Sequence, residues 1–362
     1  MPFPSVKLDS AISSHKPAPH GGLYSIPHPQ LDILDFSSNI NPLGPSPKVL
    51  KTIKNQLNKL QIYPDSESLE LRKNLQNYTK IPVTKIVVGN GAIEIIYNFC
   101  QAFLSKKTPV LIPVPTFSEY EVASKLSGAK IEFYKTMALK KDIDDFICKL
   151  PSDGCVFICN PNNPTGHLLS KNNLKKIIIA ANKKNTIVFV DECFIELVPD
   201  YNESIITLVK KYDNLFVLRS LTKSFGLAGI RIGYGIGPKK LISILNQIKI
   251  PWNVSGLAQH AASAAISTPN YLDKTKKIIQ TELNYLKTNI SKLESFDCYD
   301  SVTNFILIKT NWKSSQLQKK LLKKKILIRD CSNFRGLNQN YIRVAVKTRK
   351  ENQRLVRALE EL

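Results

Sequence analysis

The chain has 362 residues, of which 43% are hydrophobic and 22% charged, the composition of a soluble globular protein of roughly two domains. No apolar run approaches the ~20 residues of a membrane span, and the first seven residues lack the apolar core of a secretory signal. We therefore expect a cytoplasmic protein without membrane contacts.

The formal net charge of +22 is the unusual bulk property. Nucleic-acid or anionic-membrane binding is one interpretation, because a basic surface attracts both. Only nine of the 51 basic residues are arginine, however, and no cluster combines arginines with aromatic side chains, as phosphate and base recognition favours. We interpret the charge as a lysine-rich surface and predict no nucleic-acid partner.

The seven cysteines are scattered and form no Cys-x-x-Cys pair, which is typical of proteins in a reducing compartment. The nearest two, Cys155 and Cys159, flank an apolar run. This arrangement favours buried thiols in a strand over metal ligands. We predict no metal site.

In chain order, residues 1–44 are rich in proline, serine and histidine and are predicted to form an extended arm that contributes to a small domain. A short strand is expected from Leu34, and Pro47 to Gln61 has the apolar spacing of a helix. Beyond these, helical stretches alternate with near-continuous apolar runs at 86–88, 110–112, 156–158, 187–190 and 215–218. Such runs indicate an α/β domain, residues 45–252, with a mainly parallel central sheet and helices on both faces.

The pattern changes after Pro251. A long helical region at about 255–295 and a helix near 314–324 are expected, together with strands at 304–308, 326–328 and 341–345. Residues 253–362 are therefore predicted to form a smaller α+β domain.

A glycine-containing turn follows the run at 86–88. Gly89-Asn90-Gly91-Ala92 leads into an apolar helix, and free N–H groups at a helix start attract anions. The third glycine of the dinucleotide-binding pattern is missing. The turn is either an anion site, with Gly91 and Ala92 as donors, or an ordinary strand-to-helix connection.

Three further segments carry planar or polar groups at strand ends. Phe117 could stack on a planar heterocycle, although loop aromatics usually serve packing. Asn160-Pro-Asn-Asn163-Pro-Thr-Gly166 is a rigid polar loop, in which an asparagine amide can donate to a phenolate oxygen. Asp191 ends an apolar run, where an acid is costly unless it has a partner such as a protonated pyridine nitrogen. A helix N-cap is the alternative for Asp191.

Between Ser220 and Tyr234 the chain reads S-L-T-K-S-F-G-L-A-G-I-R-I-G-Y. Lys223 could form a Schiff base with an aldehyde cofactor, and Ser220 and Arg231 could hold the phosphate of that cofactor. Ser-x-x-Lys also occurs in penicillin-recognising serine enzymes, but their Ser-Asp-Asn and Lys-Thr-Gly strings do not occur in this chain. Taken together, these loops predict pyridoxal 5′-phosphate (PLP) as the cofactor.

The motifs resemble those of the fold-type I PLP-dependent enzymes, the superfamily of aspartate aminotransferase, over essentially the whole chain. The resemblance implies that Lys223 forms the Schiff base, that Asp191 pairs with the pyridine nitrogen, and that both are catalytic. It implies further cofactor contacts from Asn163 to O3′, from Phe117 to the ring, and from Gly91, Ala92, Ser220 and Arg231 to the phosphate. Tyr63 corresponds to a tyrosine that reaches the phosphate of the other subunit's cofactor, so a homodimer is expected.

Within this superfamily the chain is similar to histidinol-phosphate aminotransferases and to L-threonine-O-3-phosphate decarboxylases of cobalamin biosynthesis. Related aminotransferases usually carry tyrosine at the position of Phe194, and phenylalanine cannot donate a hydrogen bond to O3′. Other segments that look more like the decarboxylases are His20-Gly-Gly22, Asp35 to Gly44, Leu218 to Lys223, Pro251 to Val254, Ile326 to Leu337 and Tyr341 to Ala345.

The resemblance thus implies decarboxylation of L-threonine O-3-phosphate to (R)-1-aminopropan-2-ol O-phosphate. Transamination of histidinol phosphate and decarboxylation of L-serine O-phosphate are the alternatives, and one methyl group is worth only ~1–3 kcal/mol of discrimination. Arginine suits both anions of the substrate, and the candidate substrate ligands are His20, Gly21, Asn39, Asn163, Arg329 and Arg343. The two arginines either point into an interdomain cleft or lie on the surface beside strands.

Overall fold

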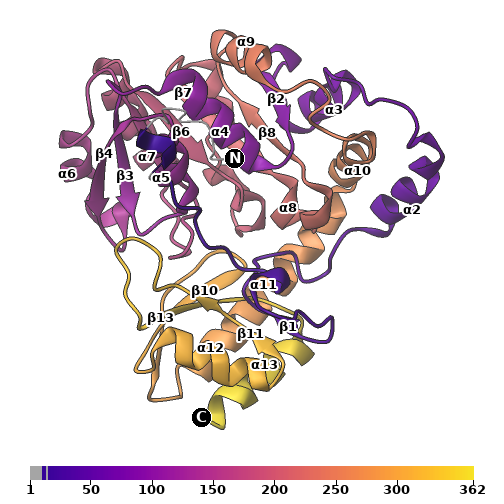
Figure 1. Ribbon diagram of the computed structural model, residues 1–362, viewed down its shortest axis with the longest axis vertical. Helices are drawn as coiled ribbons and strands as arrows, with labels where there is room; N and C mark the ends of the chain where they lie inside the picture. The colour runs from indigo at the N-terminus through magenta and orange to yellow at the C-terminus, as the bar shows by residue number, and fades with distance from the viewer. Residues whose placement is uncertain (1–9, 14) are drawn as a thin grey trace, which may run out of the picture.

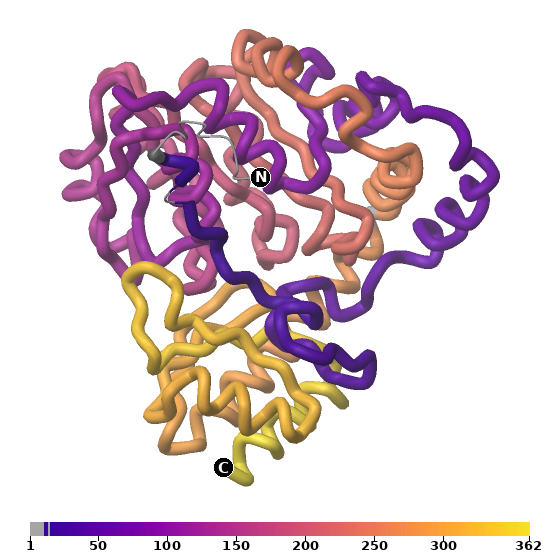
Figure 2. The backbone as a smooth tube through the Cα atoms, in the orientation of Figure 1, coloured from indigo at the N-terminus to yellow at the C-terminus, as the bar shows by residue number. Residues whose placement is uncertain are grey.

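The computed structural model describes residues 10–13 and 15–362, so residues 1–9 and 14 of the predicted arm lie outside the described part of the chain. A large sheet with helices on both faces forms one end of the molecule, and a small sheet with its own helices forms the other (Figure 1). The N-terminal segment runs from the large sheet down to the small one (Figure 2).

The large sheet has seven strands in the order β2-β8-β7-β6-β5-β3-β4. Among the described strands of this sheet, β8 alone runs opposite to the other six, so the carboxyl ends of those six lie at one edge. The bounds are β2 Ile86–Gly89, β3 Pro109–Val114, β4 Lys130–Lys135, β5 Cys155–Cys159, β6 Ile187–Asp191, β7 Leu215–Ser220 and β8 Gly233–Ile236. Binding sites in such sheets form beyond the carboxyl ends of the strands.

Apolar side chains cover both faces of this sheet because successive residues of a strand point to opposite sides. On one face, Val156 and Val188 belong to a core shared with the helices α3 (Leu69–Thr79), α6 (Ile143–Cys148), α7 (Lys171–Lys183) and α10 (Gly256–Ile266). On the other face, Phe157 and Phe189 pack with α4 (Ala92–Phe103), α5 (Glu119–Leu126) and α9 (Lys239–Ile248). None of the helices in the described residues is long and apolar enough to cross a membrane.

The small sheet is antiparallel, with the order β12-β13-β10-β9. Its strands are β9 Phe296–Cys298, β10 Phe305–Thr310, β12 Arg329–Asp330 and β13 Tyr341–Ala345. The core beneath it includes residues of α11 (Pro269–Ile290), α12 (Ser314–Lys323) and α13 (Arg349–Glu360). Strand β1 (Leu34–Asp35) pairs in parallel with β11 (Ile326–Leu327), so the arm joins this half of the molecule.

The remaining helices are α1 (Ser10–Ser13), α2 (Pro47–Gln56) and α8 (Leu221–Ser224). Helix α2 begins where the sequence signals predict, because the Ser46 side chain accepts a hydrogen bond from the Val49 N–H and Pro47 occupies the first turn. It ends at Gln56 and continues as a 3₁₀ turn, earlier than the predicted Gln61.

The predicted α/β fold class is confirmed, since each of the five apolar runs expected as strands between residues 86 and 218 belongs to the large sheet. Two of its strands were not predicted. β4 lies at an edge and carries alternating polar residues, while β8 contains two glycines in four residues. The region expected to be helical at 255–295 consists of α10 and α11, and α10 contacts α2 and α3 of the large-sheet half. The domain boundaries at 44/45 and 252/253 stay predictions.

Candidate active site

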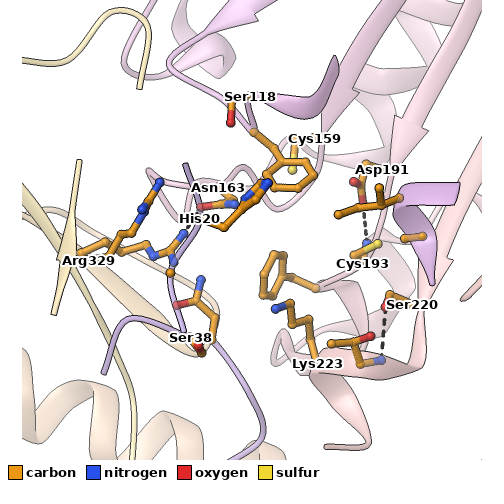
Figure 3. Close-up of a pocket in the computed structure, with 18 of the residues that line it drawn as sticks. His20, Ser38, Ser118, Cys159, Asn163, Asp191, Cys193, Ser220, Lys223 and Arg329 are labelled. Atoms are coloured by element: carbon orange, nitrogen blue, oxygen red, sulfur yellow. Dashed lines mark hydrogen bonds between the residues drawn. The ribbon is translucent and has the colours of Figure 1, made fainter. Parts of the chain in front are cut away.

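The predicted site residues come together at the carboxyl edge of the large sheet, except for two. A cavity of about 240 Å³ lies between the two sheets, and Figure 3 shows Asp191 and Lys223 on one side of it, with His20, Asn163 and Arg329 on the other. The predicted residues that line it are His20, Gly21, Asn39, Ala92, Phe117, Asn163, Asp191, Ser220, Lys223, Arg231, Arg329 and Arg343.

Gly91 and Tyr63 do not line this cavity. Gly91 lies directly behind it, where a side-chain Cβ would come within 2.5 Å of the Arg231 guanidinium. Tyr63 is 78% exposed, and its ring lies 4.9 Å from that of Trp252 on the surface of the chain.

Lys223 projects from α8, the single turn that follows β7. The turn begins with a cap, in which the Ser220 side chain accepts a hydrogen bond from the Thr222 N–H. Asn41 of the arm holds its other side, because its backbone N–H donates to the Lys223 carbonyl and its amide donates to the Ser224 carbonyl. Hydrogen bonds on both sides of the turn therefore fix the backbone from which the Lys223 side chain extends.

A buried ion network supports α8 from behind. Arg219 is 1% exposed and donates to Glu192 (2.8 Å), to Glu196 (3.4 Å) and to the Ser204 hydroxyl (2.7 Å). Ser224, the neighbour of Lys223, donates to the other oxygen of Glu196 (2.5 Å). A buried charge is tolerated when it is paired in this way, and the pairing links α8 to the segment after β6.

The ammonium group of Lys223 is in an unfavourable environment. Burial, together with the positive charge of Arg343, lowers the pKa of Lys223 from its ordinary value of 10.5 to about 8. A lysine with this pKa exchanges protons readily near neutral pH, which suits both a nucleophilic amine and a general acid.

Replacing Lys223 with methionine is expected to raise the melting temperature of the cofactor-free protein below pH 8. In the unfolded chain the lysine keeps its ordinary pKa of 10.5, so the folded state bears the full cost of the ammonium below about pH 8. That cost fades as the pH rises from 8 to 10.5, and the two melting temperatures should converge. Thermal melts of the wild type and K223M across pH 6–11 test this prediction. A difference in melting temperature that stays constant with pH would mean that packing, and not the ammonium charge, causes it.

Asp191 ends β6 and is 5% exposed. Its two oxygens accept hydrogen bonds from the Tyr120 hydroxyl (2.6 Å) and from the Cys193 N–H (2.8 Å). Burial raises the pKa of Asp191 in spite of these donors. A cationic group in the cavity would offset the cost of keeping this carboxylate ionised.

The first turn of α4 provides free N–H donors at the cavity. No side chain of the described residues caps this helix, and Ala92 at its start lines the cavity. Gly91 has a φ of +83°, which glycine adopts without strain, and it leaves room for the Arg231 guanidinium. Ala92, Ser220 and Arg231 therefore surround one end of the cavity with donors suited to a phosphate.

The loop after β5 is rigid because its own side chains pair with its backbone. Asn160 both donates to the Leu169 carbonyl and accepts from the Leu169 N–H, and Asn162 donates to the Pro115 carbonyl (2.9 Å). Asn163 instead turns its amide oxygen to the Arg343 guanidinium. The loop thus links the large sheet to the small one at the cavity.

Arg329 and Arg343 lie directly opposite each other on β12 and β13, so both guanidinium groups emerge on the same face of the small sheet. They are 8% and 6% exposed. Burial lowers the pKa of both, and that of Arg343 falls to about 10, in part because of the Arg329 charge. Two buried like charges in this register are unfavourable unless an anion lies between or beside them.

Two buried polar atoms at the cavity lack partners among the described residues. They are the amide oxygen Oδ1 of Asn39 and the Nε of Arg343. Leaving such atoms unpaired costs free energy, so both point to a polar ligand.

Several lining residues were not predicted from the sequence. They are Ser37, Ser38, Ile93, Ile96, Ser118, Cys159, Cys193, Thr222 and Phe334. Most of them are chain neighbours of predicted residues, so proximity in the sequence was an available signal. Phe334 comes from the small-sheet half and had no such signal. Phe194, singled out from the sequence, also lines the cavity and contacts Phe305 edge-on (5.1 Å).

These residues fit PLP. An aldehyde needs an amine of lowered pKa, which Lys223 supplies, and a pyridine nitrogen needs a buried acid, which Asp191 supplies. The phosphate needs the donors around Ala92, and the flat ring needs an apolar face such as that of Phe117. All four requirements are met within the one cavity.

Comparison with known proteins agrees with this fit. The family model described as "Aminotransferase class I and II" matches residues 31–359. The chain belongs to the class I and II aminotransferase family. Members of this family depend on PLP, and PLP is therefore the cofactor of this protein.

The relatives of this aminotransferase-family chain carry two different activities in their names. It is 39% identical to a "Putative threonine-phosphate decarboxylase" of Caldanaerobacter subterraneus, over 96% of this chain and 94% of that one. It also resembles the structure of the histidinol-phosphate aminotransferase from Clostridium acetobutylicum, with 34% identity, a TM-score of 0.84 and coverage of 91% and 98%. The L-threonine-O-3-phosphate decarboxylase from Porphyromonas gingivalis matches with 27% identity, a TM-score of 0.82 and coverage of 91% and 99%.

Proposed function

We propose that this enzyme decarboxylates L-threonine O-3-phosphate to (R)-1-aminopropan-2-ol O-phosphate, a step in forming the nucleotide loop of cobalamin. The opposed pair Arg329 and Arg343 carries the proposal. A phosphorylated amino acid brings two anionic groups, a phosphate and a carboxylate, and the pair offers two buried guanidinium groups to receive them. Histidinol phosphate, in contrast, has a phosphate but no carboxylate, and in the alternative reaction only 2-oxoglutarate would bring two anionic groups to the pair.

PLP, held by Lys223, Asp191 and the donors around Ala92, would supply an acceptor for the electrons of one bond at the substrate Cα. The residues of the chain choose that bond by orienting the substrate. Arg343 is fixed by Asn163 and by the Ser37 carbonyl (2.8 Å), so its guanidinium has one set direction. In the proposed reaction the bond from Cα to the carboxylate breaks, CO2 leaves, and Lys223 Nζ delivers the proton that replaces it at Cα.

The side chain at position 194 favours the decarboxylase over the aminotransferase. Phe194 borders the cavity without a hydroxyl group, whereas related aminotransferases usually have tyrosine there. One hydrogen-bond donor to the cofactor oxygen O3′ is therefore absent from this position. The 39% identical relative named for the decarboxylase supports the same choice.

We also propose that the enzyme is a homodimer and that Tyr63 reaches the partner's cofactor site. The support is a cluster of exposed apolar side chains around Tyr63, which water would disfavour in a monomer. Its other members are Leu60 and Ile62, which line the same pocket as Tyr63, and Trp252, whose ring lies beside that of Tyr63. Sedimentation equilibrium that gave a monomer at micromolar concentration would contradict this proposal.

The decisive experiment supplies purified enzyme with PLP and L-threonine O-phosphate in the absence of any keto acid. We expect release of CO2 over many turnovers. L-threonine, which lacks the phosphate, is the matched control substrate and should react with a kcat/KM at least about 100-fold lower, because charged hydrogen bonds to the phosphate are missing. L-serine O-phosphate should fall about 10-fold or more below L-threonine O-phosphate.

The alternative activity is measured in parallel with histidinol phosphate and 2-oxoglutarate. Formation of glutamate in that mixture, with no CO2 from L-threonine O-phosphate, would replace the decarboxylase by a histidinol-phosphate aminotransferase. Faster CO2 release from L-serine O-phosphate would keep the reaction and change the substrate.

A further inference from the structure

Residues 19–22 of the N-terminal arm are held at the cavity from the small-sheet side. The Arg329 guanidinium donates to the Pro19 carbonyl (2.6 Å), and the Gly22 N–H donates to the Ser37 hydroxyl (2.7 Å). Gly21 fits only without a side chain, because a Cβ there would lie 2.6 Å from the Ser37 carbonyl oxygen. These contacts place His20, between them, at the cavity.

His20 is held from the large-sheet side by Glu119 in the first turn of α5. The imidazole Nε2 lies 2.6 Å from Glu119 Oε1, and the Tyr97 hydroxyl of α4 donates to Oε2 (2.7 Å). Glu119 is 4% exposed, whereas the His20 side chain is 45% exposed. A buried acid therefore holds a ring that reaches into the cavity.

Glu119 accepts from Tyr97 at one oxygen and contacts His20 Nε2 with the other, and an ionised carboxylate can only accept, so Nε2 is the donor when Glu119 is ionised. Burial on its own would raise the pKa of Glu119, but the hydrogen bonds from His20 and Tyr97 lower it below its ordinary value. His15 of the arm adds a further favourable charge. Glu121, also on α5, pairs with Lys125 of the same helix and with Arg335. These three charged groups therefore do not compete with Glu119 for His20.

The contact restricts what His20 can offer to a ligand. With Nε2 engaged by Glu119, only Nδ1 remains for the cavity. In the neutral ring one nitrogen donates and the other accepts, so Nδ1 would repel an anion while Nε2 donates to Glu119. In the protonated ring both nitrogens donate, and the Glu119 carboxylate balances the added charge.

We propose that Glu119 is a positioning residue for substrate recognition, which holds His20 so that its Nδ1–H binds an anionic group of the substrate beside Arg329 and Arg343. The proposal rests on the proposed function to the extent that the substrate is a phosphorylated amino acid. Glu119 itself does not border the cavity among the described residues and acts through His20.

The test is a double-mutant cycle on Glu119→Gln and His20→Ala in the PLP-bound enzyme. We expect E119Q alone to raise KM for L-threonine O-phosphate about 10- to 100-fold, with kcat within about 3-fold, since one charged hydrogen bond to the substrate is lost. In the H20A background, E119Q should change KM no further, because Glu119 acts only through His20. Equal effects of E119Q in both backgrounds would overturn the proposal.

Glu121→Gln is the matched control, since it removes a carboxylate two residues away on α5 that does not contact His20. KM should stay at the wild-type value in E121Q, and a rise equal to that of E119Q would overturn the proposal by assigning the effect to α5 as a whole. Should E119Q fail to fold, Glu119→Asp keeps the charge but shortens the side chain. E119D should raise KM while the visible absorbance of the bound cofactor stays unchanged; wild-type KM in a folded E119D would contradict the proposal.

A failure of the proposed function can be distinguished from a failure of the role proposed for Glu119. If wild-type enzyme releases no CO2 from L-threonine O-phosphate, the same cycle is measured as the dissociation constant for that compound, from the change in cofactor absorbance on titration. Additivity in this binding cycle refutes the role of Glu119, and absence of CO2 alone refutes the decarboxylase.

Discussion

Replacing Lys223 with alanine is expected to abolish multiple turnover, with kcat reduced by at least about 10³-fold. In the proposed mechanism the lysine is both the amine that joins the cofactor and the acid that delivers a proton at Cα, so its loss would remove two roles at once. Borohydride reduction followed by mass spectrometry should find PLP attached at Lys223 in the wild type and not at any lysine of K223A. Steady-state kinetics measures the loss of kcat.

Two further variants make this result specific. Lys223→Arg keeps a cation but cannot form the Schiff base, and it should be as inactive as K223A. Lys240→Ala removes an exposed lysine of α9 and should keep the wild-type kcat. Wild-type turnover in K223A would refute the assignment of Lys223.

Replacing Asp191 with asparagine is expected to lower kcat/KM by about 10²- to 10³-fold while the fold is retained. Asparagine has the same shape and can still accept from the Cys193 N–H, but it cannot balance a protonated pyridine nitrogen. Because burial raises the pKa of Asp191, its ionised form destabilises the cofactor-free protein at neutral pH. The cofactor-free D191N protein should therefore melt no lower than the wild type at pH 7.

Activity and stability together decide this prediction. Asp213→Asn, at an exposed position before β7, is the control and should change neither kcat/KM nor the melting temperature. A D191N enzyme with wild-type kcat/KM would show that the carboxylate has no catalytic role. A lower melting temperature at pH 7 would show instead that Asp191 has a structural role in capping the residues after β6.

Five strands of the large sheet were predictable because burial on both faces demands continuous apolar runs, whereas β4 lies at an edge and has polar residues in alternation. β8 was not predictable in the same way. Its glycines leave room for neighbours: a Cβ on Gly233 would lie 2.6 Å from the Ala92 N–H nitrogen, and one on Gly235 would lie 2.4 Å from the Phe216 ring. Close packing of distant segments, and not local propensity, determines this strand.

Most of the residues proposed to contact the cofactor could be predicted from the sequence because they lie near the end of a strand that the sequence pattern reveals. Asp191 ends a strand, Phe117, Asn163 and Lys223 follow within a few residues of one, and the carboxyl ends of parallel strands must meet at one edge. The parallel strands therefore bring side chains that are far apart in the sequence together at one edge of the sheet. The PLP prediction needed only this rule and the residue types.

Other features arise only from tertiary structure. The opposition of Arg329 and Arg343 depends on the register of β12 and β13, which lie in separate segments of the chain. The contact of His20 with Glu119 joins residues 99 positions apart, and the network of Arg219 with Glu192 and Glu196 brings buried charges together behind α8. The sequence offered His20, Arg329 and Arg343 as candidate ligands, but it gave no sign of their partners or of the buried positions of Glu119 and Arg219.

By itself, then, the sequence determined the fold class and the cofactor and predicted the lysine that would bind it, because strand patterns and the loops that follow them are local. Only the tertiary structure decided how the proposed substrate end of the cavity is built, since its arginines, its histidine and the acid behind that histidine come from a second sheet, an arm and a helix. Contacts of that kind depend on how distant segments pack, and no local pattern in the chain records them.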